Sequence, residues 1–185
     1  MRMDQQLNTI LEEKIPAFVL EVNEIVEMID NEQKPLESKF IQQLIDKAGP
    51  IYVDAMVDHL HLWSKVRILK LDKQIKDDVS TMEVLEAIEG QVSKNHECFA
   101  KEYSEMIITY HTDRTKLERD LHRSQGNEAL VEFDQRFIDF LRIKLEESRD
   151  FVLVLLKLAE EKMDLLLTSS EKQKAKKNEH MSMYN

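Results

Sequence analysis

Residues 128–167 read "EALVEFDQRFIDFLRIKLEESRDFVLVLLKLAEEKMDLLL", and their apolar positions recur every three or four residues. This spacing is typical of one face of an α-helix. The stripe includes Phe133, Phe137, Leu141, Leu145 and Val152. At ~1.5 Å per residue, a helix of about 40 residues is about 60 Å long. The stretch therefore predicts one long helix in a tall molecule.

Six consecutive residues of this helix, 151–156, are apolar ("FVLVLL"). A helix that is apolar on every side is buried on every side. Either a second subunit covers the extra face, or a bent neighbouring helix of the same chain does. The first alternative predicts an oligomer. The run is far too short to span a bilayer, so we expect a soluble protein with no membrane partner.

Apolar stripes with the same spacing predict three more helices, at residues 4–30, 37–71 and 81–122. Pro16 is expected to kink the first helix or to set its effective start. Gly49 before Pro50 predicts a sharp bend in the second. Ser80, with Glu83 three residues later, predicts the N-cap of the third. The fold class expected for residues 1–170 is therefore all-α, an elongated four-helix bundle.

The composition agrees with long helices, because 34% of residues are charged and only 3 Gly and 3 Pro interrupt the chain. The formal net charge is −10; residues 171–185 carry four Lys and two Glu, a local +2, which leaves −12 for the rest. A body this acidic repels phosphate backbones, so nucleic-acid binding is not expected. The lysines of the tail form either a solubilising linker or a weak nuclear-targeting patch.

The sequence carries no recognisable catalytic motif, so the chain is predicted not to be an enzyme and to need no cofactor or metal. Three glycines cannot build a phosphate-binding loop. His59 and His61 are two apart, so on a helix they point ~200° apart and cannot share a metal. Asp58 and His61 have the i, i+3 spacing of a di-metal site, but no equivalent pair occurs on another helix. Cys98 is expected to be a buried thiol rather than a nucleophile.

The chain ends "EHMSMYN" (179–185), after a polar, lysine-rich run. Apolar side chains beyond the folded body bury nothing within it. Either Met183, Tyr184 and Asn185 are a terminal accident with no ordered role, or they fit a pocket on a partner. We therefore describe residues 171–185 as a flexible C-terminal tail, with docking as its candidate role.

Two segments resemble the proteasome activator REG family (11S regulators). The first runs from "KFIQQLIDKAGP" through "LHLWSKVRILKLDKQIKDDVSTMEVLEAI", and the second is "EFDQRFIDFLRIKLEESR". Without a gap, the first segment places these residues on identical or similar family positions: Lys47, Pro50, Trp63, Ile68, Lys70, Leu71, Asp72, Val79 and Ser80. The second matches at Glu132, Asp134, Leu141, Arg142, Glu147 and Arg149. The resemblance covers about residues 39–185, and the long family insert between helices one and two is replaced by a few residues.

The resemblance implies a homo-oligomeric ring, usually of seven subunits, that caps the 20S proteasome core particle in the nucleus, the cytoplasm or both, without ATP. C-terminal tails, here Met183, Tyr184 and Asn185, enter pockets between core-particle subunits. An activation loop presses on the gate so that peptides pass. By position, that loop comprises Lys70, Leu71, Asp72, Lys73, Gln74, Ile75, Lys76, Asp77, Asp78 and Val79.

The loop departs from the family pattern. Leu69 stands where the family has proline, and residues 74–78 replace a Gly-Asn-Asn-Phe-Gly run whose small residues set the loop conformation. We therefore expect binding to the core particle more firmly than stimulation of peptide hydrolysis. The alternative is a non-catalytic helical scaffold or adaptor whose acidic faces bind a basic partner.

Overall fold

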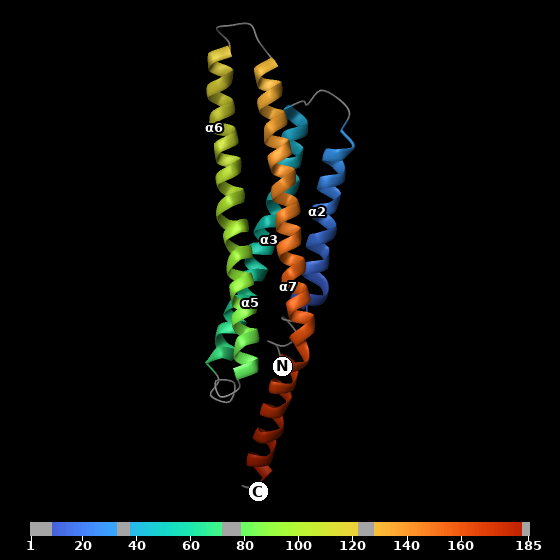
Figure 1. Cartoon of the computed structure of the whole chain (residues 1–185), viewed down its shortest axis with the longest axis vertical. Coiled ribbons are helices and arrows are strands. Elements are labelled where there is room, and N and C mark those ends of the chain that lie inside the picture. Colours follow the sequence, from blue (N-terminus) through green and yellow to red (C-terminus); the bar gives the residue numbers. More distant parts are fainter. Residues whose placement is uncertain (1–8, 33–37, 72–78, 122–127, 183–185) are drawn as a thin grey trace.

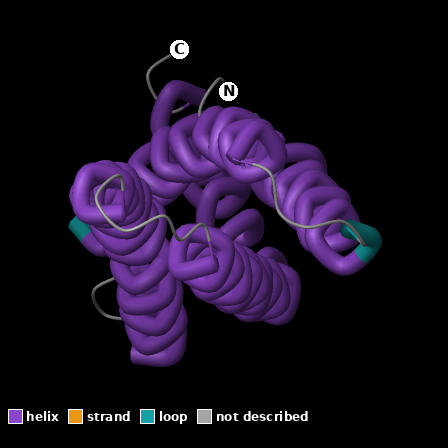
Figure 2. Tube along the Cα trace, turned by 90° about the horizontal axis from the view of Figure 1, so that it is seen from above, coloured by secondary structure: helices purple, strands orange, loops and turns teal. Residues whose placement is uncertain are grey.

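The computed structural model describes residues 9–32, 38–71, 79–121 and 128–182, with side chains described as far as Ala159. The described chain forms four helical rods and no strands, which confirms the all-α, four-helix prediction. In order, the elements are η1 (Ile10–Lys14), α2 (Ile15–Asp30), α3 (Ser38–Lys70), α5 (Val79–Glu97), η2 (Cys98–Glu102), α6 (Tyr103–Leu121) and α7 (Glu128–Ser182). Seen from above, helix makes up nearly the whole described path, with loop confined to helix ends (Figure 2).

Pro16 marks the junction between η1 and α2, as the sequence suggested for the effective start of the helix. Proline has no N–H, so it cannot donate to the carbonyl four residues earlier. The N–H of Ile15 instead donates to the carbonyl of Ile10, five residues back, which closes a π-turn. The first rod therefore continues through the proline with a local change of hydrogen-bond register.

Pro50 lies inside α3, where a sharp bend was predicted. The helical assignment is continuous from Ser38 to Lys70, so neither Gly49 nor Pro50 ends the helix. The third rod begins at Val79, one residue before Ser80, so Ser80 lies in the first turn rather than at the predicted N-cap. A second π-turn, η2, joins α5 to α6 without interrupting the rod.

The fourth rod, α7, is longer than the apolar stripe predicted. The stripe ends at about Leu167, but the helix continues to Ser182. Residues 168–182 contain neither glycine nor proline, and Glu, Lys, Gln and Ala have high intrinsic helix propensity. Beyond the body of the bundle, α7 therefore continues as a helix into the segment expected to be a flexible tail (Figure 1).

The core lies between α7, its neighbours α2 and α5, and α3, which packs against α5 and α2. Its largest fully buried side chains include Ile25, Leu44, Leu85, Leu141 and Leu145. Burying one such side chain contributes about 1.5–3 kcal/mol. The i, i+3 and i, i+4 positions of each stripe thus supply the driving force that holds the rods together.

The apolar run at 151–156 is only partly covered within one chain. Val152 and Leu155 are completely buried, whereas Leu153 and Val154 are 41% and 48% exposed. The alternative in which a neighbouring helix of the same chain covers the extra face is therefore wrong for Leu153 and Val154. Within the described residues, no helix is both long enough and apolar enough to cross a membrane.

Candidate functional site

The helix ends that flank the predicted activation loop, the end of α3 and the start of α5, lie at the same end of the bundle as the C-terminal end of α7 (Figure 1). α3 descends to Lys70 at this end, and α5 starts upward again at Val79. Of the ten predicted loop residues, Lys70, Leu71 and Val79 are described, and residues 72–78 lie outside the described part. The predicted docking residues Met183, Tyr184 and Asn185 also lie outside it.

Four charged side chains and one tryptophan join the helices that flank the loop. We call them the stem clamp: Trp63, Arg67 and Lys70 on α3, and Glu86 and Glu89 on α5. Lys70 Nζ donates to Glu89 Oε2 at 2.7 Å and lies 3.8 Å from Glu86 Oε1. The indole N–H of Trp63 donates to Glu89 Oε1 at 3.3 Å. The clamp therefore joins the end of α3 to the second and third turns of α5, the two helices that flank the loop.

Arg67 completes the clamp. Its guanidinium lies 5.0 Å from the centre of the Trp63 ring, and its Nε lies 3.9 Å from Glu89 Oε1. The hydrogen bond from Lys70 is the main cause that lowers the pKa of the Glu89 carboxyl, with Trp63 and Arg67 adding to it. Glu89 thus accepts hydrogen bonds from Lys70 and Trp63 and forms a longer ion pair with Arg67.

Apolar side chains at this end face outward. Leu71 and Val79, the residues flanking the loop, are 71% and 70% exposed, and Ile68 is exposed as well. Isolated exposed apolar residues are ordinary, but three around one loop form a patch of the kind that marks a contact surface.

Glu86 and Glu89 were not predicted from the sequence, and Trp63 was named there as a position that matches the REG family. Trp63 does pack against the core, with its indole nitrogen turned to Glu89. Glu89 belongs to no motif, and its partner Lys70 lies 19 residues away. Only the antiparallel packing of α3 on α5 brings the two together, so no local signal could have found the clamp.

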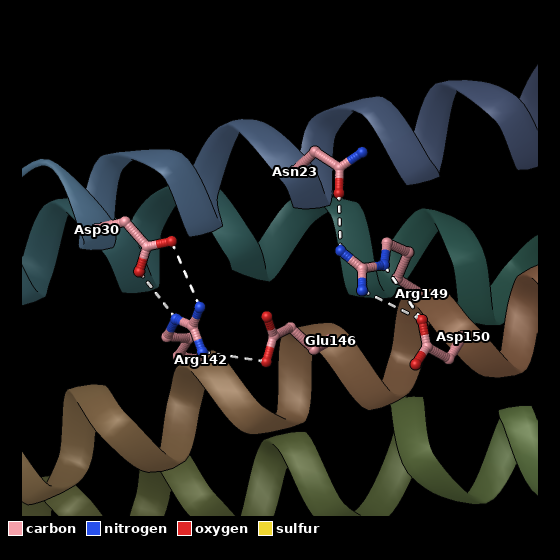
Figure 3. A network of polar contacts seen from close by, with 6 residues as sticks. All are labelled: Asn23, Asp30, Arg142, Glu146, Arg149 and Asp150. Carbon is pink, nitrogen blue, oxygen red and sulfur yellow. Dashed lines mark hydrogen bonds and ion pairs between the residues drawn. The ribbon is translucent and has the colours of Figure 1, made fainter.

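Most residues that carry the REG resemblance on α7 make contacts between helices. Arg142 donates from Nε to Asp30 Oδ1 at 2.9 Å, and Arg149 donates from Nη1 to Asn23 Oδ1 at 3.1 Å, so both bind α7 to α2 (Figure 3). Figure 3 also shows the local pairs of Arg142 with Glu146 and of Arg149 with Asp150.

Asp134 is buried between α6 and α7. It accepts hydrogen bonds of 2.9 Å from both the hydroxyl of Tyr110 and Nε of Arg114. On α3, Lys47 Nζ lies 3.1 Å from Glu24 Oε2 of α2. The residues that match the REG family at these positions thus help to pack the helices together. At these positions, the resemblance is therefore evidence about the fold and not about binding.

A second polar cluster is buried halfway along the bundle, next to η2. The Nε2 of His59 lies 3.0 Å from Nδ2 of Asn95, and Ser148 Oγ lies 2.8 Å from Tyr52 OH and 3.4 Å from Cys98 Sγ. Burial raises the pKa of the Cys98 thiol. A raised pKa disfavours the reactive thiolate, which agrees with the prediction of a buried thiol.

His59 itself is buried, with Nδ1 2.7 Å from the carbonyl oxygen of Ala55. His61 is exposed on the same helix, so the two do not converge. Among the residues that the structure describes, no group of three or more His, Cys, Asp or Glu side chains is placed to hold a metal ion.

No protein-family model matches the chain, and neither a curated protein nor a solved structure does. The class of protein defined by the fold is a helical bundle with a clamped loop at one end. Membership of the REG family rests on the motif residues and remains a prediction.

Proposed function

We propose that this protein is a non-catalytic, ATP-independent regulator of the 20S proteasome core particle. In this proposal several copies form a homo-oligomeric ring, with seven as the expected number, in the nucleus, the cytoplasm or both. The tails of the ring bind the end of the core particle, and the loops at 70–79 act on its gate.

The observation that carries the proposal is the common position of the loop stems and the C-terminal end of α7. A cap that docks by its tails and acts by its loops needs both at the same end. The stem clamp supports the proposal further, because a loop that presses on a partner needs fixed stems. Leu71 and Val79 add exposed apolar surface at this end.

Exposed apolar side chains on two helices support self-assembly. On α3, Val53, Val57, Leu60 and Ile68 are exposed and recur on one face. On α7, Leu153 and Val154 are exposed. Two such surfaces on different helices can join one copy to the next, and a head-to-tail contact that closes makes a ring.

Several tails acting together would strengthen the docking. A single apolar tail contributes about 25 cal/mol per Å² buried, which is weak for three residues. Linked copies raise the effective concentration of each further tail, so a ring binds much more tightly than one chain.

The experiment compares the full chain, a variant lacking Met183–Asn185, and the single variants Tyr184→Ala and Glu179→Ala. Binding to purified core particle and hydrolysis of a fluorogenic peptide are both measured. We expect the deletion and Tyr184→Ala to abolish binding, and Glu179→Ala to leave it unchanged. Absence of binding by the full chain, or equal binding by the deletion variant, contradicts the proposal.

Light scattering tests the assembly separately. A ring of seven would have about seven times the chain mass of 21.9 kDa. A mass of one or two chains, together with absence of core-particle binding, would favour the adaptor function, in which the acidic body binds a basic partner.

A further inference from the structure

The upper parts of α6 and α7 extend beyond the other two helices as a two-helix arm (Figure 1). Asp30, the last residue of α2, contacts Arg142 of α7, and α7 begins at Glu128. The 14 residues between these levels span about 21 Å of helix. Tyr103 contacts the carbonyl of Ile45 near the start of α3, and α6 continues from there to Leu121. Among the residues that the structure describes, the arm is therefore formed by α6 and α7.

The two helices of the arm are joined by one well-ordered contact. The ring of Tyr110 stacks on that of Phe137, with centroids 3.9 Å apart, and on Phe133 at 5.7 Å. Asp134 accepts from Tyr110 and from Arg114 through both of its carboxylate oxygens. This contact fixes the spacing of α6 and α7 and makes the arm a rigid surface.

A groove of about 600 Å³ runs between η2, α6 and α7 from the base of the arm upward. Its floor is apolar and mainly aromatic: Met106, Tyr110, Phe133, Phe137 and Phe140. Phe140 is 46% exposed at its edge. A groove between two helices that has an apolar floor is suited to receiving a further helix.

The two walls of this arm groove carry opposite charges. Glu102, Glu105 and Asp113 line the wall of η2 and α6, and Arg136 and Lys144 line the wall of α7. Glu102 and Lys144 already pair with each other at 2.8 Å within one chain, and Arg136 also pairs with Glu132 on its own helix. The charge match with a partner therefore rests on Glu105 of one wall and Arg136 of the other. A partner helix whose charges all had the same sign would be repelled by one of the two walls. A second copy of the same surface would not, because a two-fold axis parallel to the arms sets the α6 wall of each copy against the α7 wall of the other.

We propose that the occupant of the arm groove is the arm of a second copy of this chain. The two arms lie side by side in parallel, with α6 of each against α7 of the other, and together they form a four-helix bundle. Phe133 and Phe140 of each copy lose their contact with water in the pair. The pairing does not rest on the proposed proteasome function, because it uses the opposite end of the molecule from the loop and the tail.

The test uses two charge-reversal variants, Glu105→Arg and Arg136→Glu. Each alone sets like charges against each other at both contacts of the pair, and a mixture restores opposite charges at every contact. By analytical ultracentrifugation at low salt, we expect the wild type to associate, each variant alone to dissociate at least tenfold more readily, and the mixture to regain wild-type association. Glu97→Arg, an exposed charge reversal on α5 outside the groove, is the matched control and should associate as the wild type does.

Circular dichroism and urea unfolding establish that both variants are folded. Phe140→Ser gives an independent check, because it removes an apolar side chain from the groove and should weaken association without changing the charge of either wall. A wild type that remains monomeric at high micromolar concentration overturns the inference, as does a mixture that stays dissociated. The peptide-hydrolysis assay fails or succeeds independently of either result.

Discussion

Lys70 and Glu89 lie 2.7 Å apart, nitrogen to oxygen, and thereby join the last residue of α3 to the third turn of α5. Lys70 is the last residue of α3, and Glu89 lies ten residues after the start of α5 at Val79. A loop whose two stems are joined in this way starts and ends at defined points, whatever path it takes between them.

Replacing Glu89 should loosen this join. Glu89→Gln removes the charge that Lys70, Trp63 and Arg67 share, and we expect a loss of about 0.5–1 kcal/mol, the upper range for an ion pair near the surface. Urea unfolding measures the loss, and hydrogen exchange of the last turn of α3 should accelerate. Glu86→Gln is the control, because Glu86 lies farther from Lys70 and is mostly exposed. Equal effects of the two variants would contradict the assigned role of Glu89.

The Glu89 contribution should depend on pH. Its pKa in the folded protein is lowered by Lys70, so the unfolded chain binds the proton more readily. The stabilisation is therefore present above the unfolded pKa, about 4.3, and is lost as pH falls through the lower folded value. The difference in unfolding free energy between the wild type and Glu89→Gln should shrink below pH 4. A constant difference down to pH 2 would show that the charge is not the cause.

His59 should make the protein less stable in mild acid. Burial lowers its pKa to about 4, with the neighbouring His96 adding to the shift, against an unfolded value of about 6.5. The unfolded chain binds the extra proton between these values, so stability is complete above pH 6.5 and falls toward pH 4, by about 2–3 kcal/mol at pH 4.5. Urea unfolding at several pH values should give a flatter profile for His59→Gln than for the wild type. His111→Gln, at an exposed position, should keep the wild-type profile; if His59→Gln keeps it too, this prediction is wrong.

Substitution of Asp134 should lower the free energy of unfolding more than substitution of most other polar residues. Asp134→Ala leaves the Tyr110 hydroxyl and the Arg114 guanidinium without their buried acceptor, and breaking a buried ion pair costs about 3–5 kcal/mol. Tyr110→Phe removes one hydrogen bond to a charged group and should cost about 1.5–3 kcal/mol. Chemical denaturation measures both. Asp139→Ala, at an exposed position one turn later, should change stability little, and a comparable loss there would argue against a special role for Asp134.

Replacing a buried leucine and an exposed leucine with alanine should have very different effects on stability. Leu145 is completely buried and Leu20 is 65% exposed. Leu145→Ala leaves a cavity and should cost about 2–5 kcal/mol. Leu20→Ala should change stability by less than about 0.5 kcal/mol. Thermal unfolding of the two variants in parallel tests the assignment of inner and outer faces, and similar melting temperatures would contradict it.

The rods could be predicted because the signals that specify them are local. The spacing of Leu141, Leu145 and Val152 indicates a helix and its inner face, and these three residues are completely buried. The same reasoning failed at Phe140, which belongs to the apolar stripe but is half exposed on the arm. The same reasoning also predicted too early an end for α7. An apolar stripe shows only where a helix packs against its neighbours, whereas α7 continues beyond the stripe through residues of high helix propensity.

The candidate site was predicted only in part. Spacing and the REG resemblance pointed to the loop at 70–79, but the residues that hold its stems carry no sequence signature. Glu89, Asp134 and Asp30 look like any other acidic residues of a chain with net charge −10.

By itself, the sequence determined four helical rods, the faces they bury and the turns between them, because side-chain spacing and helix breakers act within a few residues. Only the tertiary structure decided which charges meet, how far the arm of α6 and α7 projects, and that the loop and the end of α7 share one end of the bundle. Those features join residues from 19 to 112 positions apart, such as Lys70 with Glu89 and Asp30 with Arg142. Contacts at that separation depend on how whole helices dock, which no short stretch of sequence specifies.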